Sequence, residues 1–166
     1  MLETKKAIVV AGVSGCGKST IGRALAEQIG WPFLEADEFH SQASREKMAA
    51  GLALNDADRA PWLATLNREL MRRAPVVLAC SALKQRYRDR LSAGLDAAFV
   101  WIELSRELAM QRVANRPDHF MPASLVDSQF EAAEAPREAV FLSATESVEA
   151  SVQRCSKNLA GFVRAG

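Results

Sequence analysis

Short apolar runs alternate with stretches of helical periodicity along most of the chain. The largely apolar runs occupy residues 7–10, 33–34, 76–79, 99–104 and 140–142. A short, continuous apolar run is typical of a strand that is buried on both faces of a sheet. From Ser19 to Ile29 the apolar residues follow helical spacing, and further helices are predicted over residues 62–73 and 147–163. Strands separated by helices predict a three-layer α/β fold, in which a five-stranded parallel sheet is flanked by helices.

Two stretches, residues 36–61 and 117–122, fit neither periodicity. Irregular segments inside a compact domain often carry functional residues. The chain contains no internal repeat, no low-complexity tract and no linker rich in Pro, Gly or Ser. We therefore expect residues 1–166 to form a single domain.

The composition is that of a globular protein and excludes wholesale disorder, with 49% hydrophobic and 25% charged residues among 166. The net charge of +1 provides no basic excess that would attract nucleic acid or an anionic membrane. No apolar run reaches the roughly 20 residues of a membrane-spanning helix. Residues 1–6 lack a signal-peptide pattern, and three cysteines without CxxC spacing indicate neither disulfides nor a zinc site. We expect a cytoplasmic protein with no nucleic-acid or membrane partner.

Residues 12–19, Gly-Val-Ser-Gly-Cys-Gly-Lys-Ser, match the phosphate-loop pattern G-x-x-x-x-G-K-[ST] at every fixed position. The segment follows a predicted strand and opens a predicted helix, which is the context that this loop requires. Backbone N–H groups cradle phosphate, Lys18 reaches the β- and γ-phosphates, and the Ser19 hydroxyl is a ligand of Mg²⁺. We therefore predict ATP and Mg²⁺ as cofactors. The predicted nucleotide-binding residues are Gly12, Val13, Ser14, Gly15, Cys16, Gly17, Lys18, Ser19 and Thr20.

A phosphate loop identifies a nucleotide site but not a reaction. The D-x-x-G and N-K-x-D motifs of regulatory GTPases are absent from the sequence. This absence argues against a regulatory GTPase.

Two carboxylates, Glu35 and Asp37, follow the second predicted strand, and His40 lies three residues further on. The carboxyl edge of a parallel sheet faces the ligand crevice, and residues at i and i+2 of an extended chain point to the same side. Glu35 is then a candidate to steady Mg²⁺, and Asp37 a candidate to orient or deprotonate an attacking hydroxyl. A solvated acidic loop is the alternative, and an isolated histidine is more often structural.

Two further clusters are candidates for binding the acceptor. Asp56 lies in an irregular polar segment, where either it or Asp58 could instead cap a helix that begins near Pro61. Lys84 and Arg88 are spaced i and i+4 after the third predicted strand, so they share one helix face. Two cations there could bind a substrate carboxylate, and a solvated basic face is the alternative.

Arg112 and Arg116 have the same i and i+4 spacing and precede a short loop bounded by prolines that contains His119. This pattern predicts a lid over residues 112–124 that closes on ATP. Arginines in such a lid stack on adenine or neutralise the transferring phosphate. Ordinary surface arginines are the alternative.

Six segments match the motifs of one known family. They read Gly-Val-Ser-Gly-Cys-Gly-Lys-Ser, Ala-Asp-Glu-Phe-His, Glu-Lys-Met-Ala-Ala-Gly-Leu-Ala-Leu-Asn-Asp-Ala-Asp-Arg-Ala-Pro-Trp-Leu, Cys-Ser-Ala-Leu-Lys-Gln-Arg-Tyr-Arg-Asp, His-Phe-Met-Pro-Ala-Ser-Leu-Val-Asp-Ser-Gln-Phe and Glu-Ala-Pro. With them the chain resembles the gluconokinases, small P-loop kinases related to shikimate and adenylate kinases, over residues 7 to about 136. Ser41, Ser44 and Ala53 depart from the residues usual in that family, and the segment after Arg137 carries no family motif.

The resemblance implies a gluconokinase, which transfers the γ-phosphate of ATP to the 6-hydroxyl of D-gluconate and gives 6-phospho-D-gluconate and ADP. It also implies a substrate-binding region over about 37–62 and raises a homodimer as an assembly. The implied catalytic residues are Lys18, Asp37 and Arg116, with Arg112 at the nucleotide and Ser19 and Glu35 at the metal. The implied gluconate-binding residues are Asp37, His40, Asp56, Arg59, Lys84, Arg88 and His119. A kinase for another hydroxy acid such as shikimate, or a nucleotide-binding regulatory module with little turnover, are the alternatives.

Overall fold

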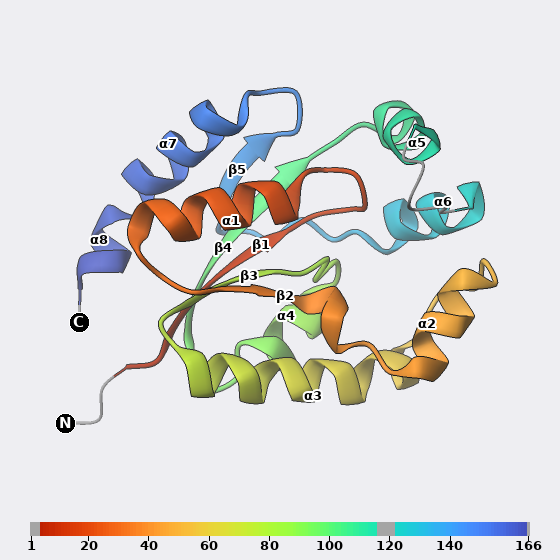
Figure 1. Cartoon of the computed structure of the whole chain (residues 1–166), viewed down its shortest axis with the longest axis horizontal. Helices are drawn as coiled ribbons and strands as arrows, with labels where there is room; N and C mark the ends of the chain where they lie inside the picture. The colour runs from red at the N-terminus through yellow and green to blue at the C-terminus, as the bar shows by residue number, and fades with distance from the viewer. Residues whose placement is uncertain (1–3, 116–121, 166) are drawn as a thin grey trace.

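The structure, a computed structural model, describes residues 4–115 and 122–165. Five parallel strands form one sheet in the order β2-β3-β1-β4-β5 (Figure 1). The strands are β1 (Lys6–Ala11), β2 (Phe33–Glu35), β3 (Val76–Ala79), β4 (Asp96–Glu103) and β5 (Val140–Ser143). Each strand contains one of the predicted apolar runs or most of it, so the predicted five-stranded parallel sheet is confirmed.

The central strand β1 explains why its sequence is uniformly apolar. Val9 pairs with Leu78 of β3 on one side and with Phe99 of β4 on the other. All six residues of β1 are buried, because helices cover both faces of the sheet. The carboxyl end of this strand leads directly into the phosphate loop at 12–19.

Eight α-helices and one 3₁₀-helix are found in the part of the chain that the structure describes. They are α1 (Lys18–Ile29), η1 (Ala36–Phe39), α2 (Gln42–Ala49), α3 (Asp56–Arg73), α4 (Gln85–Leu91), α5 (Arg106–Ala114), α6 (Ala123–Ala132), α7 (Val148–Asn158) and α8 (Ala160–Arg164). Helices α1 and α7 pack on one face of the sheet, and α3 and α4 pack on the other. Helices α5 and α6 pack on each other through a small cluster of their own, beyond the carboxyl ends of the strands (Figure 1).

The prediction that residues 36–61 are irregular is wrong, because most of this segment is helical. The hydrophobic pattern did not predict helix α2, because Ser44 is its one buried residue and the helix has no apolar stripe. Helix α3 begins five residues before Pro61, and its N-cap is Asn55 rather than either aspartate. The Asn55 side chain accepts from the N–H of Asp58, and the Asp58 carboxylate accepts from the N–H of Asn55, both over 2.8 Å. This reciprocal capping box fixes the start of the helix.

None of the helices among residues 4–115 and 122–165 combines the length and the hydropathy needed to cross a membrane.

Candidate active site

The phosphate loop connects β1 to α1 and has backbone angles that only glycine adopts easily. Gly12 has a φ of +152°, and a Cβ on it would lie 2.8 Å from Cys16 Sγ. Gly17 has a φ of +95° and is the N-cap of α1. Both positions therefore require glycine, for a close approach at Gly12 and for the left-handed turn at Gly17. The Cys16 side chain is buried in the core beneath the loop, which favours packing over reactivity for this thiol.

Side chains from α5 and α6 hold the outer part of this loop. The guanidinium of Arg112 donates to Gly15 O over 2.8 Å and to Ala144 O over 2.7 Å. The side chain of Gln129 exchanges two hydrogen bonds with Ser14. Arg112 also lines a cavity of about 310 Å³ together with Gly17 and Thr20. Arg112 therefore lies beside the loop, on the side where the rest of a nucleotide could be accommodated.

Ser19 and Glu35 meet at the start of α1, and their oxygens suit a magnesium ion. The Ser19 hydroxyl donates to Glu35 Oε2, whereas Glu35 Oε1 is buried and has no hydrogen-bond partner in the part of the chain that the structure describes. A buried carboxylate oxygen beside a hydroxyl is a donor set that a hard cation prefers. The described residues contain no cluster of three or more His, Cys, Asp or Glu that could hold a metal. That is compatible with Mg²⁺, which is usually held by one or two protein oxygens together with phosphates and water.

Asp37 is not part of an extended chain, because η1 begins directly after β2. The prediction that Glu35 and Asp37 share one side of a strand is therefore wrong. The chain nevertheless brings both carboxylates to the end of β3. Burial raises the pKa of Cys80 there to about 12, and the charges of Asp37, Lys18 and Glu35 also act on that thiol. The side chain of Asp37 is 70% exposed, so a hydroxyl can reach it.

His40 lies against the first turns of α3. Its ring stacks on Trp62, with ring centroids 4.3 Å apart, and Trp62 Nε1 donates to Ala36 O over 2.9 Å. Burial is the largest effect on the pKa of His40 and lowers it below the usual value, although Asp37 at 3.8 Å opposes the shift. The imidazole is therefore neutral at neutral pH, and its Nδ1 is buried without a hydrogen-bond partner among the described residues. A neutral ring suits hydrogen bonding to a hydroxyl better than binding of a carboxylate.

Three of the predicted acceptor residues line one cavity of about 610 Å³, which we call the Lys84 pocket. Its lining residues are Leu54, Asn55, Asp56, Ala57, Arg59, Lys84, Tyr87, Ser128, Glu131 and Ala132. The Tyr87 hydroxyl donates to Asp56 Oδ1 over 2.5 Å, and Arg59 donates to the Tyr87 oxygen over 3.3 Å. Hydrogen bonds from Tyr87 and Arg86 lower the pKa of Asp56, so this carboxylate is ionised at neutral pH.

Tyr87 lines the Lys84 pocket although no sequence pattern predicted it as a site residue. The signal was available, since Tyr87 belongs to the same motif as Lys84 and lies three residues after it. Its ring lies within 6 Å of the charged groups of Arg59, Lys84 and Arg86, at 5.2, 5.8 and 5.5 Å. A negatively polarised ring face helps to keep several cations in one place.

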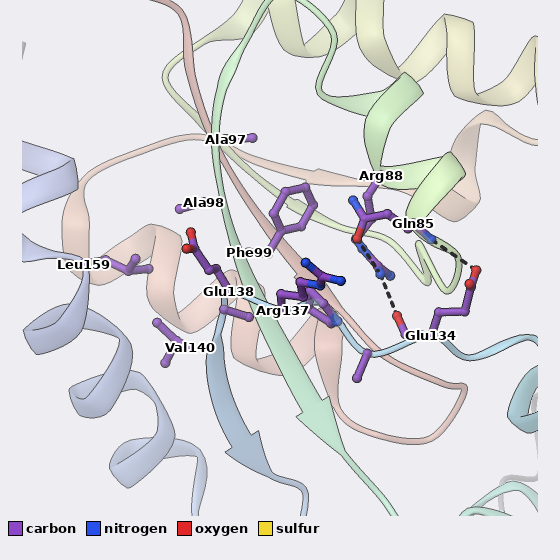
Figure 2. A pocket seen from close by; sticks show the side chains of 13 residues that line it. Gln85, Arg88, Ala97, Ala98, Phe99, Glu134, Arg137, Glu138, Val140 and Leu159 are labelled. Atoms are coloured by element: carbon purple, nitrogen blue, oxygen red, sulfur yellow. Dashed lines mark hydrogen bonds between the residues drawn. The ribbon is translucent and has the colours of Figure 1, made fainter.

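Arg88 does not lie in the Lys84 pocket, so the prediction that it and Lys84 share an open face is wrong. Its guanidinium donates to Ala82 O over 2.7 Å and to Glu134 O over 2.6 Å. Figure 2 draws the hydrogen bond to Glu134 as a dashed line. The guanidinium lies 5.5 Å from the ring of Trp101, and the residue is 1% exposed. Burial lowers the pKa of this guanidinium, although Glu134 and Asp89 oppose the shift. Arg88 thus ties α4 to the segment before β5, beside a separate cavity of about 920 Å³ (Figure 2).

We expect Arg88→Ala to lower the free energy of unfolding by about 3 kcal/mol or more, because two carbonyls lose a charged donor in the interior. Urea unfolding followed by circular dichroism measures this loss. Arg90→Ala on the exposed side of the same helix is the matched control, with an expected change within about ±0.5 kcal/mol. Equal urea midpoints for Arg88→Ala and Arg90→Ala would contradict the structural role assigned to Arg88.

The predicted lid is described only at its two ends. Residues 112–115 belong to α5 and the turn after it, and α6 begins at Ala123. Arg116 and His119 lie outside the described residues, so their proposed contacts with phosphate and gluconate remain predictions.

A phosphate loop between the first strand and helix of a five-stranded parallel sheet, joined through helix α6 to a polar pocket, defines a small P-loop kinase. Residues 14–160 match the shikimate kinase family. A gluconokinase of Gluconobacter oxydans is 46% identical over 134 residues, which cover 78% of this chain and 75% of that protein. A probable gluconokinase of Mus musculus is 43% identical over 157 residues, covering 81% and 85%. The chain belongs to the gluconokinases, within the shikimate kinase family.

Solved structures agree with this assignment. A gluconokinase from Sinorhizobium meliloti superposes with a TM-score of 0.87 at 40% identity, covering 98% of this chain and 95% of that one. A shikimate kinase from Bacteroides thetaiotaomicron reaches a TM-score of 0.66 at 17% identity, covering 95% and 99%. The likeness to the shikimate kinase shows the fold alone, because only 17% of the residues are identical. The likeness to the gluconokinase extends to the sequence, at 40% identity. The chain is therefore a phosphotransferase.

Proposed function

We propose that this chain transfers the γ-phosphate of ATP to the 6-hydroxyl of D-gluconate, giving 6-phospho-D-gluconate and ADP. The observation that carries the proposal is the Lys84 pocket, which combines cations with hydrogen-bonding groups and shares helix α6 with the phosphate loop. Gluconate carries one carboxylate and five hydroxyls, so its site needs both kinds of group. Helix α6 borders both places, since Ser128 lines the pocket and Gln129 bonds the loop.

The carboxylate of gluconate is assigned to Lys84 and Arg59, the two cations that line the pocket. The hydroxyls are assigned to Asp56 and Tyr87, which can accept and donate, and to the neutral ring of His40. Asp37 is assigned to the reacting hydroxyl, which it orients and whose proton it accepts. This division leaves positive charge at one end of the acceptor and a carboxylate at the other.

ATP would be bound by the backbone N–H groups of the phosphate loop, with Lys18 at its terminal phosphates. The half-buried hydroxyl of Ser19 and the carboxylate of Glu35 would hold Mg²⁺, as their oxygen chemistry fits. When bound, the ion neutralises charge on the phosphates. A cytoplasmic location and a homodimer remain predictions from the sequence.

A kinase for shikimate or another hydroxy acid is the second candidate, because residues 14–160 match the shikimate kinase family. ADP release measured with D-gluconate, its epimers and shikimate separates the two. We expect kcat/KM to be highest for D-gluconate. Preference for shikimate, or ATP binding with no acceptor-dependent ADP release, would contradict the proposal.

We expect Lys84→Ala to lower kcat/KM for gluconate roughly ten- to a hundredfold, because a charge-assisted contact to the carboxylate is lost. The dissociation constant of ATP should change little, since Lys84 lies in the pocket rather than at the loop. Lys157→Ala, on the exposed side of α7, is the control for removing a lysine. If Lys84→Ala leaves kcat/KM for gluconate unchanged, Lys84 does not bind the gluconate carboxylate, and Arg59 becomes the candidate for that contact.

A further inference from the structure

The side chain of Gln129 makes two hydrogen bonds to one residue of the phosphate loop. The backbone N–H of Ser14 donates to Gln129 Oε1 over 2.6 Å, and Gln129 Nε2 donates to Ser14 Oγ over 2.9 Å. The two residues are 115 positions apart in sequence, and α6 brings them together beside the turn between β1 and α1 (Figure 1). One side chain therefore holds both the backbone and the hydroxyl of Ser14.

The position of Ser14 makes this contact relevant to phosphate. Ser14 is the third residue of the loop, between the glycines at 12 and 15. Such a loop binds phosphate well when its N–H groups already point into the cradle, because no reorganisation is then needed on binding. The next residue is held by α5, from which the guanidinium of Arg112 donates to Gly15 O over 2.8 Å. Gln129 and Arg112 together fix the outer turn of the loop from two helices.

Helix α6 also forms part of the wall of the Lys84 pocket. Ser128 precedes Gln129 directly and Glu131 follows it by two residues, and both line that pocket. A ligand that orders this wall acts on the same helix that holds Ser14. Conversely, a nucleotide that orders the loop acts on the wall. Binding free energies that are linked in this way are reciprocal.

We propose that Gln129 is a positioning residue that ties the phosphate loop to the wall of the Lys84 pocket and so couples ATP binding to acceptor binding. The identity of the acceptor rests on the proposed function, whereas the contact with Ser14 does not. The cost of ordering loop and helix is met by whichever ligand binds first, so the second ligand binds more tightly.

Calorimetric titration of the full chain with a non-hydrolysable ATP analogue and Mg²⁺, with and without saturating D-gluconate, measures the coupling. We expect gluconate to tighten binding of the analogue roughly fivefold or more in the unaltered protein, within the usual range of coupling between sites. In Gln129→Ala this factor should fall to about one, and kcat/KM for gluconate should fall roughly tenfold or more with the loss of two hydrogen bonds. Gln129→Met keeps most of the side-chain volume and serves if the alanine variant folds poorly.

Hydrogen exchange of the Ser14 amide, followed by NMR in the ligand-free protein, provides a readout that needs neither turnover nor gluconate. The exchange should be faster in Gln129→Met than in the unaltered chain, because the amide loses its acceptor. Gln153→Ala, an exposed glutamine of α7, should leave exchange and coupling unchanged. If gluconate is not the acceptor, coupling with gluconate is absent in every variant, but the exchange difference at Ser14 persists.

Two results would overturn the proposal. Gln129→Met with the exchange rate and the coupling factor of the unaltered protein would show that the contact is incidental. Tighter binding of the analogue by Gln129→Met would show that Gln129 occupies a backbone N–H of the loop that phosphate would otherwise use, instead of positioning the loop.

Discussion

Replacing Lys18 by alanine is expected to lower kcat by roughly a hundred- to a thousandfold or more. Lys18 is the first residue of α1 and half-buried at the end of the phosphate loop. Its ammonium group can reach the phosphates, where negative charge is redistributed in the transition state. The backbone cradle, formed by Gly15 and Gly17 among others, remains in the variant, so binding of ADP should weaken far less than kcat. Steady-state ADP release and calorimetric titration of ADP measure the two effects.

The fold should survive this change, because the core residues of β1 and α1 do not depend on the lysine charge. The thermal midpoint of Lys18→Ala should therefore match that of the unaltered protein within a few degrees. Lys157→Ala is again the control for loss of one positive charge. A well-folded Lys18→Ala variant with near-normal kcat would contradict the assignment of residues 12–19 as a phosphate-binding loop.

The sheet could be predicted from sequence because its strands are buried on both faces. Ile8 and Val9 illustrate this, since they are neighbours in β1 and belong to the core clusters on opposite faces of the sheet. Neither can be replaced by a polar residue without cost. The phosphate loop could be predicted for a different reason. The shape of the loop requires glycine at fixed positions such as Gly12, so the pattern of glycines in the sequence is enough to predict it.

Helix α2 and the first turn of α3 were harder to predict, because neither buries a large apolar side chain. Helix α2 buries only Ser44, so its sequence has no helical spacing of apolar residues from which the helix could be predicted. The start of α3 was missed because Asn55 and Asp58 cap each other while Pro61, six residues into the helix, suggested a start. Helix α2 and the first turn of α3 are held by their caps, Ser41 and Asn55, and a cap leaves no apolar stripe in the sequence.

Arg88 and Gln129 show why the direction of a side chain could not be predicted. Spacing of i and i+4 places Arg88 and Lys84 on one helix face, but it does not say which of them the rest of the fold covers. The segment around Glu134 covers Arg88 and accepts its hydrogen bond. Gln129 reaches Ser14 across 115 residues of sequence, and no local pattern marks such a contact. Long-range packing decides both cases.

The sharpest test of the reaction itself is Asp37→Asn, which we expect to lower kcat roughly a hundred- to ten-thousandfold with little change in ATP affinity. Asparagine keeps the size of aspartate and can still form a hydrogen bond, but it cannot accept the proton of the 6-hydroxyl. The position of Asp37 supports this expectation. It is exposed at the end of β2, and its charge acts on Cys80 together with that of Lys18. A hydroxyl at Asp37 would lie at the same carboxyl edge of the parallel sheet as the loop that carries Lys18.

Glu38→Gln is the matched control, because Glu38 is also exposed, lies in the same 3₁₀ turn and carries the same charge. Its kcat should remain within about twofold of the unaltered value, since an exposed carboxylate away from the acceptor contributes little. Steady-state kinetics with varied gluconate and varied ATP, combined with titration of an ATP analogue, separate the possibilities. A rise in the KM for ATP at unchanged kcat would place Asp37 with Ser19 and Glu35 at the metal. Equal losses in Asp37→Asn and Glu38→Gln would show that the turn needs its overall charge instead of one base. Only a loss of kcat confined to Asp37→Asn fits a carboxylate that acts on the attacking hydroxyl.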